Sequence, residues 1–469
     1  MELKENCGIT GVYGNKKAAE IIHSALFSLQ HRGQESCGII TGSGKNHSSA
    51  MGMGLVSDVF KPACMKTLRG HFGIGHVRYS TTGSSSPKNI QPFIAEYRGK
   101  TYAISHNGNL VNSTSLRRSL EKRGSIFRTS LDTEIIMHMI MMSRKESFIE
   151  KILDVLPEIK GAFSLVFFSP EGIVAAKDPW SFRPLCLGKL EEGYMVASES
   201  CAFDFAGASY IRELEPGEVL VIDGKGIKSI LPEKRVRTAR CIFEFIYFAR
   251  PDSRVFGESV YHARKKLGEN LAKEFPHTGE MVIPIPDSGS ISAIGFSQEK
   301  GLPFEMGIVR NHYVGRTFIQ PLQESREKSV RIKLNPIKEV IGGKDIVVIE
   351  DSIVRGTTSR MRITDLRKSG AKKIYMGVSC PPIRHPCFYG IDFPDSRQLI
   401  AGKKSVKEIE KEIGVDGLIY LSMESMLASI RLPGEEFCTA CFTGEYPVPC
   451  GSQARLKKER FETGRRGKE

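Results

Sequence analysis

The sequence contains no long hydrophobic run. No stretch approaches the ~20 consecutive apolar residues that a membrane-spanning helix requires, and the most apolar one, residues 135–142, is short and interrupted by His138. The segment before Cys7 lacks the apolar core of a secretion signal. The chain also has no internal repeat and no long low-complexity linker. We therefore expect a cytoplasmic protein without a membrane partner.

The composition is that of a globular protein with a basic excess. The 469 residues predict two to four domains at roughly 100–200 residues each, and the 40% hydrophobic share suffices for buried cores. The net charge of +14 suits nucleic acid, membrane lipid or a phosphorylated small molecule. Part of it lies in residues 455–468, which are typical of a solvated tail. In a cytoplasmic chain, 11 cysteines point away from disulfides and towards metal binding or catalysis.

The two halves of the chain follow different patterns. Up to about residue 235, strand-like runs alternate with amphipathic helices, and glycines and serines separate them. From residue 236 to about 430, apolar strands alternate with helical patterns, which is the rhythm of a parallel sheet with crossover helices. The predicted strands are 102–105, 163–168 and 219–222 in the first half, and 281–285, 346–349 and 374–378 in the second. The predicted domains are residues 7–235 and 236–432, followed by a cysteine-bearing segment and basic tail, 433–469.

Cys7 stands close to the N-terminus, directly before a strand-like run. A thiol needs a base to become a nucleophile at neutral pH. If residues 1–6 were removed, Cys7 would carry a free α-amino group, whose pKa of ~8 suits that role. The alternative is a small residue of the core, which is the commoner fate of an isolated cysteine.

Polar residues gather where the predicted strands of the first half end. The clusters are residues 31–36 (HRGQES), 75–81 (GHVRYST), 105–109 (SHNGN, between a strand and a helix) and 132–134 (DTE, opening a helix). Each alone is compatible with a simple turn, but loop positions of this kind often carry binding residues. In this order after a near-terminal cysteine, the clusters resemble the N-terminal-nucleophile glutamine amidotransferases over nearly all of residues 7–235.

This resemblance implies an αββα sandwich, with two antiparallel sheets between helices, and a set of roles. Cys7 attacks the amide carbon of glutamine, and Arg78 pairs with the substrate carboxylate, for which a planar guanidinium is suited. Asp132 holds the α-ammonium group. Asn107 and the backbone N–H of Gly108 stabilise the tetrahedral oxyanion.

Two positions depart from the pattern of those enzymes. Leu131 stands where a serine often precedes the aspartate, and Ser181, within DPWSFRPL, stands where glycine is usual. Neither change removes a proposed catalytic group, although Ser181 is expected to alter a turn.

The strongest motif of the second half is residues 346–358, IVVIEDSIVRGTT. A buried strand leads to two carboxylates, and Gly356 and the threonines then open a helix. Glycine lets the backbone approach an anion, and N–H groups at a helix start receive phosphate. Carboxylates suit ribose hydroxyls or magnesium. The alternative is an ordinary strand–loop–helix crossover with acidic loop residues.

The run resembles the phosphoribosyl pyrophosphate motif of type I phosphoribosyltransferases, with Glu350 where close relatives often carry Asp. Residues 284–289 (PIPDSG) would cradle pyrophosphate, and the basic stretch from Arg310 to about Leu334 resembles a loop that closes over the substrate. The resemblance implies phosphoribosyl pyrophosphate binding by Arg316, Glu350, Asp351, Ser352, Arg355, Gly356, Thr357 and Thr358, and Mg²⁺ binding by Ser288, Glu350 and Asp351.

Both halves in this order resemble the glutamine phosphoribosylpyrophosphate amidotransferases, from residue 7 to about residue 447. That family transfers ammonia from glutamine to phosphoribosyl pyrophosphate, which yields 5-phosphoribosylamine in the first committed step of purine synthesis. The resemblance further implies a homotetramer inhibited by purine nucleotides. Two other readings are a different amidotransferase, such as one that makes glucosamine phosphate, and a non-enzymatic regulator that binds nucleic acid. The first would lack the 350–358 motif and the second would not need the Cys7 set, so we expect no nucleic-acid partner.

Four cysteines in the second half form a candidate metal site. Cys438 and Cys441 make a CxxC, and Cys241 and Cys387 complete four thiolates. Such soft ligands suit zinc or an iron–sulfur cluster, and spacing does not decide between them. One subgroup of the resembling family holds a [4Fe–4S] cluster through these four contexts and has a cleaved leader, here residues 1–6.

Overall fold

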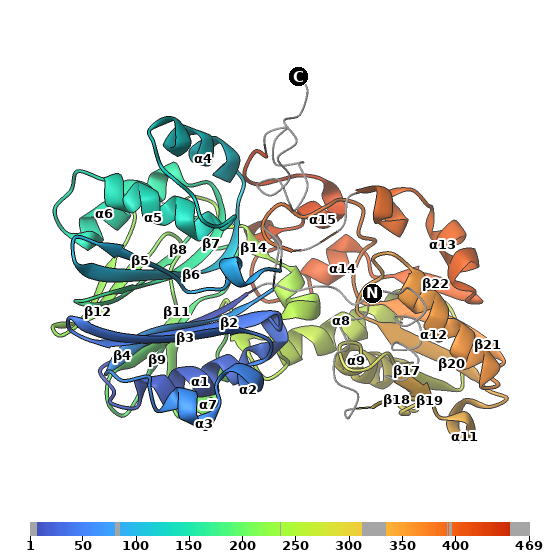
Figure 1. Ribbon diagram of the computed structural model, residues 1–469. Helices are drawn as coiled ribbons and strands as arrows, with labels where there is room; N and C mark the ends of the chain where they lie inside the picture. The colour runs from blue at the N-terminus through green and yellow to red at the C-terminus, as the bar shows by residue number, and fades with distance from the viewer. Residues whose placement is uncertain are drawn as a thin grey trace.

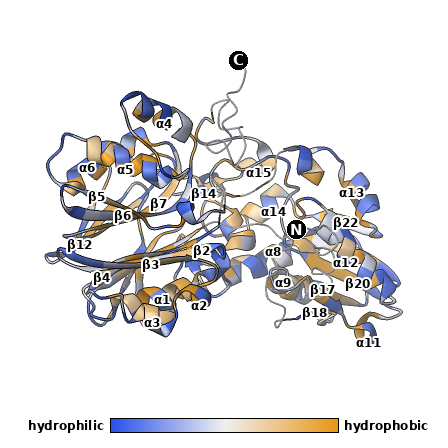
Figure 2. Ribbon diagram, in the orientation of Figure 1, coloured by the Kyte–Doolittle hydropathy of each residue, from blue (hydrophilic) through white to orange (hydrophobic). Residues whose placement is uncertain are grey.

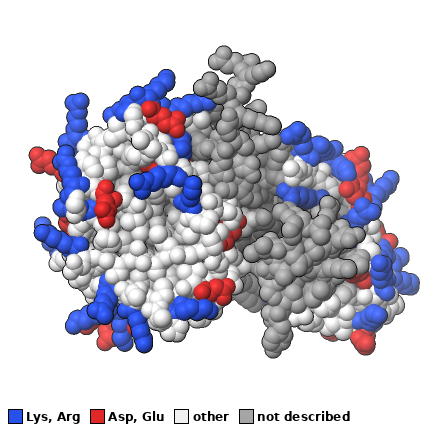
Figure 3. All heavy atoms as spheres, in the orientation of Figure 1, with Lys and Arg blue, Asp and Glu red and all other residues white. Residues whose placement is uncertain are grey.

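The computed structural model describes residues 7–79, 85–234, 236–311, 334–391, 393 and 396–450. The proposed leader and Arg316 lie outside these described residues. The two halves of the chain lie side by side, with the two-sheet half on the left and the parallel-sheet half on the right of Figure 1. On the face in Figure 3, Lys and Arg are dispersed among acidic and neutral side chains over both halves. No helix in the described ranges is long and apolar enough to cross a membrane.

Two antiparallel sheets form the centre of the first half. Within the described residues one sheet has seven strands and the other has six. In sheet order the first is β11 (Ser209–Glu213), β9 (Cys186–Lys189), β10 (Tyr194–Ala197), β1 (Gly8–Tyr13), β4 (Phe72–Arg78), β2 (Ser36–Ser43) and β3 (Asn46–Met53). The second is β13 (Gly226–Ile230), β12 (Val219–Asp223), β8 (Gly172–Lys177), β7 (Gly161–Ser169), β6 (Lys100–Leu110) and β5 (Phe93–Tyr97).

Helices cover the outer face of each sheet, so that three apolar layers form (Figure 1). On the first sheet lie α1 (Ala18–Ser28), α2 (Val56–Val59), α3 (Pro62–Met65) and α7 (Cys201–Ala206); on the second lie α4 (Ser113–Lys122), α5 (Asp132–Met142) and α6 (Phe148–Val155). Strands such as β7 are buried along their whole length because they face apolar side chains on both sides. The predicted αββα sandwich is confirmed.

A parallel sheet organises the second half. Its strands, in sheet order, are β17 (Met281–Pro284), β20 (Asp345–Glu350), β21 (Lys373–Val378) and β22 (Gly417–Tyr420). The principal helices are α8 (Val260–Glu274), α9 (Ser290–Lys300), α11 (Lys338–Ile341), α12 (Thr357–Lys368), α13 (Val406–Ile413), α14 (Met423–Leu427) and α15 (Ala440–Thr443). Hydrophobic residues concentrate in the strands and the inward helix faces (Figure 2). Short strand pairs complete it: β14 (Arg240–Cys241) with β23 (Phe437–Cys438), β15 (Arg254–Val255) with β16 (Glu258–Ser259), and β18 (Ile308–Arg310) with β19 (Leu334–Pro336).

A buried group of charges joins the two halves. Glu244, in the π-helix Glu244–Phe248, accepts two hydrogen bonds from Arg32, at 2.8 and 3.0 Å, and one from Arg183, at 3.0 Å. Arg32 also pairs with Glu199. The side chains of these four residues are at most 1% exposed. Because two arginines face two glutamates, the charges compensate one another inside the molecule.

Two local features refine the sequence predictions. Residues 105–109 do not form a turn between a strand and a helix, because β6 continues through them and pairs with β7 as far as Leu110. Gly108 lets the strand pass this close to β7, because it has no Cβ atom to meet the backbone of Ala162. Ser181 has a φ of +61°, the left-handed conformation that normally selects glycine, so its departure from the family pattern falls on a real turn.

Candidate active sites

Cys7 lies at the start of β1, next to the end of β4. The antiparallel register places Gly8 opposite Val77, so Cys7 is beside Arg78. The thiol lies 3.6 Å from the backbone oxygen of Tyr79. Burial raises the pKa of the Cys7 thiol above its ordinary value, and the positive charge of Arg78 opposes that increase. The thiol is therefore mostly protonated at neutral pH unless a base is supplied.

Asn107 and Gly108 lie on β6, in the facing sheet. The side chain of Asn107 is fully buried, and among the described residues neither its oxygen nor its nitrogen has a hydrogen-bond partner. Gly108 has a φ of +145°, and a Cβ there would be 2.1 Å from the Ala162 oxygen. Only glycine fits at this position. Because unpaired buried amides are rare and costly, Asn107 is poised to bind a polar ligand.

Asp132 begins α5 and is connected to the same strand. Its Oδ2 atom accepts a hydrogen bond from the backbone N–H of Leu110 at 2.9 Å. Another hydrogen bond links the two facing sheets: Nε2 of His76 donates to the backbone oxygen of His106, at 3.1 Å. Burial lowers the pKa of His76 to about 3, so this ring is neutral and its Nε2 carries the donated proton. The structure thus places Cys7 beside Arg78 and holds Asp132 against β6, the strand that carries Asn107, while the His76–His106 bond links β4 and β6.

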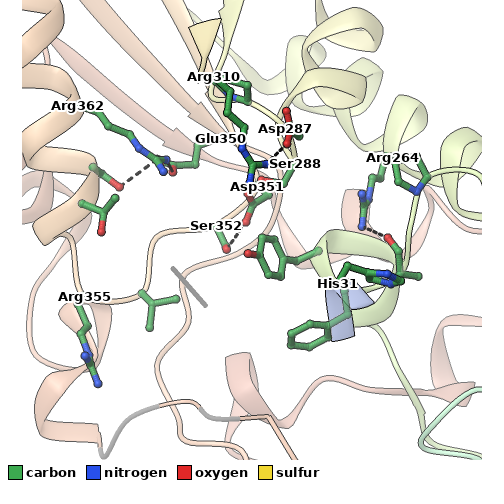
Figure 4. Close-up of a pocket in the computed structure, with 18 of the residues that line it drawn as sticks. His31, Arg264, Asp287, Ser288, Arg310, Glu350, Asp351, Ser352, Arg355 and Arg362 are labelled. Atoms are coloured by element: carbon green, nitrogen blue, oxygen red, sulfur yellow. Dashed lines mark hydrogen bonds and ion pairs between the residues drawn. The ribbon is translucent and has the colours of Figure 1, made fainter. Parts of the chain in front are cut away.

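A pocket of about 280 Å³ lies at the carboxyl end of the parallel sheet. It collects every described residue to which the resemblance assigns phosphoribosyl pyrophosphate or Mg²⁺ binding by name, and Figure 4 labels Ser288, Glu350, Asp351, Ser352 and Arg355 among them. These residues are Ser288, Glu350, Asp351, Ser352, Arg355, Gly356, Thr357 and Thr358. Such pockets outside the ends of parallel strands are common ligand sites.

The two carboxylates at the end of β20 are held by different partners. Asp351 accepts hydrogen bonds from the hydroxyls of Ser288 and Ser352. Glu350 accepts one hydrogen bond from Nη1 of Arg362, at 2.7 Å, and one from Oγ of Ser359, at 3.0 Å. Burial raises the pKa of Glu350 to about 7, and Arg362 opposes that shift. Burial also raises the pKa of Asp351.

Gly356 shapes the entry to α12. Its φ is +75°, and a Cβ at this position would lie 2.5 Å from the Cδ1 atom of Ile400. The left-handed turn lets the chain reverse into the helix, whose first residues, Thr357 and Thr358, line the pocket. N–H groups at a helix start can receive phosphate oxygens.

Several pocket residues were not predicted from the sequence. Arg362 lies on α12, and His31 comes from the first half of the chain. Nε2 of His31 is 2.8 Å from an oxygen of Glu199. The helical period places Ser359 and Arg362 on one face of α12, and that signal was available for Arg362. No local spacing links His31 to a site more than two hundred residues further along the chain.

The four candidate cysteine ligands are neighbours in the fold. Cys241 and Cys438 lie opposite each other in the pairing of β14 with β23. Cys441 follows in α15. Cys387 accepts the backbone N–H of Tyr389 at 3.3 Å. Burial is the largest cause that raises the pKa of all four thiols, and their charges act on one another.

The four cysteines lie close together, but their side chains are not arranged as a set of metal ligands. Across the described ranges, no three His, Cys, Asp or Glu side chains converge closely enough to hold a metal ion. Cys387 packs against the apolar cluster that contains Cys241 and Cys441 and against the one that contains Cys438, so the four cysteines lie in one region of the fold. The four thiols therefore form a cluster of soft donors, three of them buried and Cys387 partly exposed, and not a formed ligand shell.

Comparisons with known proteins assign first the N-terminal half and then the whole chain to known families. Residues 76–204 match the family described as glutamine amidotransferase domain, and the first half is therefore of the glutamine amidotransferase class. Amidophosphoribosyltransferase 1, chloroplastic, of Arabidopsis thaliana is 47% identical over 447 residues, which cover 95% of this chain and 79% of that one. The amidophosphoribosyltransferase of Bacillus subtilis is 44% identical and is covered to 95%, as is this chain.

Solved structures extend the agreement to the whole fold. The glutamine phosphoribosylpyrophosphate amidotransferase of B. subtilis, complexed with ADP and GMP, superposes with a TM-score of 0.90 at 43% identity and covers 95% of this chain and 98% of its own. A structure described as the allosteric regulatory enzyme of purine biosynthesis gives a TM-score of 0.91 at 43% identity, covering 96% of this chain and 97% of its own. The chain belongs to the amidophosphoribosyltransferase family.

Proposed function

We propose that the two sites divide one reaction, the transfer of ammonia from glutamine to phosphoribosyl pyrophosphate. Cys7 attacks the glutamine amide, which releases ammonia and leaves a thioester that water hydrolyses to glutamate. Ammonia then attacks the anomeric carbon at the second site, and pyrophosphate leaves. The products are 5-phosphoribosylamine, glutamate and pyrophosphate. The observation that carries this proposal is the single pocket that gathers the described motif residues of the second half together with His31 of the first.

At the glutamine site, the roles follow from burial and from the partners of each side chain. Arg78 would bind the substrate carboxylate, and Asp132 the α-ammonium group. Asn107 and the N–H of Gly108 would stabilise the oxyanion, because the buried amide of Asn107 has no hydrogen-bond partner among the described residues and needs no rearrangement before it binds. Residues 1–6 would be a leader whose removal exposes the α-amino group of Cys7 as the base.

The second site would bind its substrate through the 350–358 motif. Ser352, Gly356, Thr357 and Thr358 would bind the phosphate group at the start of α12, and Arg316 and Arg355 would compensate its charge. Ser288, Glu350 and Asp351 supply only oxygen donors close together, which fits magnesium. When bound, Mg²⁺ would neutralise charge on the leaving pyrophosphate.

Cys241, Cys387, Cys438 and Cys441 would hold a [4Fe–4S] cluster. The donor set fits, because four cysteines from neighbouring segments offer soft thiolate ligands, and a bound metal cation stabilises the thiolate form. Zinc is the competing occupant. Metal analysis of protein purified without oxygen distinguishes them: we expect about four irons with a broad visible absorption, which is lost in Cys438→Ser. One zinc without that absorption would overturn the cluster.

Regulation, assembly and location extend the proposal. The B. subtilis structure contains ADP and GMP, which supports inhibition of this chain by purine nucleotides. A homotetramer and a cytoplasmic location are proposed from the family resemblance.

The decisive test separates the two half-reactions. Formation of 5-phosphoribosylamine is measured with glutamine or with ammonia, for the reconstituted protein and for its Cys7→Ala variant. We expect the variant to lose only the glutamine reaction. A variant that still uses glutamine would refute Cys7 as the nucleophile, and the protein would then be retested as a simple phosphoribosyltransferase.

A further inference from the structure

The carboxylate of Glu350 is held in place by α12, through residues that follow the 350–358 motif in the chain. Arg362 and Ser359, three residues apart on α12, each contact one of its two oxygens, at 2.7 and 3.0 Å. The side chains of Arg362 and Glu350 are only 13% and 7% exposed. Figure 4 shows the guanidinium of Arg362 beside Glu350, at the edge of the pocket.

Asp351 is organised in another way. Both of its hydroxyl partners, Ser288 and Ser352, lie on loops at the ends of strands, and they are neutral. A glutamate has one more rotatable bond than an aspartate, so its carboxylate needs more restraint to occupy one position. Two contacts from one rigid helix provide that restraint, because the pair on α12 moves as a unit.

Arg362 also faces the pocket with unused hydrogen-bonding capacity. Its Nε atom is buried and has no hydrogen-bond partner among the described residues, and Arg362 lines the pocket together with Glu350 and Ser359. A buried donor without a partner is costly, so the guanidinium is kept at this edge of the pocket by its pair with Glu350.

We propose that Arg362 is a positioning residue for phosphoribosyl pyrophosphate, which holds the carboxylate of Glu350 against the pocket so that it accepts hydrogen bonds from the ribose hydroxyls. This inference rests on the proposed function of the pocket. Each carboxylate oxygen that bonds to α12 keeps a further lone pair for a substrate hydroxyl. Because Oε1 already pairs with Arg362, this oxygen is better suited to a hydroxyl donor than to a second cation, whereas Oε2, whose partner is the neutral hydroxyl of Ser359, stays suited to magnesium.

The test measures the ammonia-dependent reaction, which bypasses the glutamine site, in Arg362→Met and Arg362→Lys. Arg360→Met is the matched control, since Arg360 lies on the same helix but is exposed. We expect Arg362→Met to lower kcat/KM for phosphoribosyl pyrophosphate roughly 10–100-fold, mainly through KM. Arg362→Lys should recover part of this loss, and Arg360→Met should stay within about twofold of the parent. Direct titration with phosphoribosyl pyrophosphate should show the same order of affinities.

A double-mutant cycle decides whether Arg362 acts through Glu350. In a Glu350→Gln background, adding Arg362→Met should change KM by less than about twofold, because the carboxylate it positions is gone. Fully additive effects, or an Arg362→Met variant indistinguishable from Arg360→Met, would overturn the inference. Thermal melting of each variant identifies a general loss of fold, which would lower glutamine hydrolysis as well. If the parent protein makes no phosphoribosylamine from ammonia, the proposed function fails instead.

Discussion

Asn107 and Glu350 both lie at the carboxyl-end region of a buried strand, yet their surroundings differ. Among the described residues, the amide of Asn107 has no hydrogen-bond partner, whereas both oxygens of Glu350 are already bonded to α12. The proposed glutamine site thus leaves a polar group for a ligand to bind, whereas in the proposed phosphoribosyl pyrophosphate site the protein already supplies partners to the carboxylates. We therefore expect the site at Asn107 to gain hydrogen bonds when its ligand binds, and the site at Glu350 to depend on how well its carboxylates are held in place.

The largest expected effect is that of removing the Asn107 amide on glutamine hydrolysis. Asn107→Ala removes a buried donor aimed at the proposed oxyanion, so kcat for glutamine hydrolysis should fall roughly 10²–10³-fold. The KM for glutamine should change little, because the effect belongs to the transition state. Steady-state glutamate release gives both constants. The ammonia-dependent reaction is the internal control, and a parallel loss there would place Asn107 outside the glutamine site.

A change at Asp351 tests the proposed phosphoribosyl pyrophosphate site. Asp351→Asn keeps the size of the side chain but removes one charge and weakens the proposed magnesium site, so activity should fall roughly 10–100-fold. Both the ammonia- and the glutamine-dependent formation of phosphoribosylamine should fall together. Raising the magnesium concentration should restore part of the rate. Loss of the glutamine reaction alone would contradict the assignment.

The protonation of Cys7 gives a pH-dependent prediction. Burial raises the pKa of the thiol, so at neutral pH less thiolate is present than for an ordinary cysteine. Alkylation of the full-length chain by iodoacetamide should therefore rise about tenfold per pH unit and continue to rise above pH 9. Mass spectrometry of the Cys7 peptide measures the rate, and Cys7→Ser provides the background. A plateau below pH 8 would show that a base already activates the thiol with residues 1–6 in place.

The smallest expected effect concerns Ser181. Because its φ is +61°, Ser181→Gly should relieve backbone strain and raise the free energy of unfolding by about 1 kcal/mol. Denaturant melts of the two proteins measure the difference. Unchanged or lower stability would mean that the buried serine side chain contributes as much as the strain costs.

Much of the fold was predictable because apolar periodicity reports burial directly. The predicted strand 163–168 lies within β7 and 346–349 lies within β20. Residues 105–109 were harder, because a glycine and polar residues are typical of turns, and only pairing with β7 shows that they continue β6. The phosphoribosyl pyrophosphate motif is contiguous, so its residues could be found together.

Contacts between distant segments set the limit of prediction. The partnership of Cys7 with Arg78 depends on the register of β1 and β4, and that of Arg362 with Glu350 depends on how α12 packs beside β20. His31 reaches the pocket only because the two halves meet. Local sequence patterns carry no information on these distances, and the resemblance to known enzymes supplied the roles that the patterns could not.

The buried charges that join the halves restrict how this enzyme can be taken apart or recombined. A cut at residue 235 would leave Glu244 on one piece and both Arg32 and Arg183 on the other. Arg183 and Glu244 would lose each other as partners, at a cost of several kcal/mol for an ion that stays buried, whereas Arg32 would keep Glu199. The halves are therefore not interchangeable modules: a glutaminase half transplanted from another enzyme would need arginines at both places before it could dock.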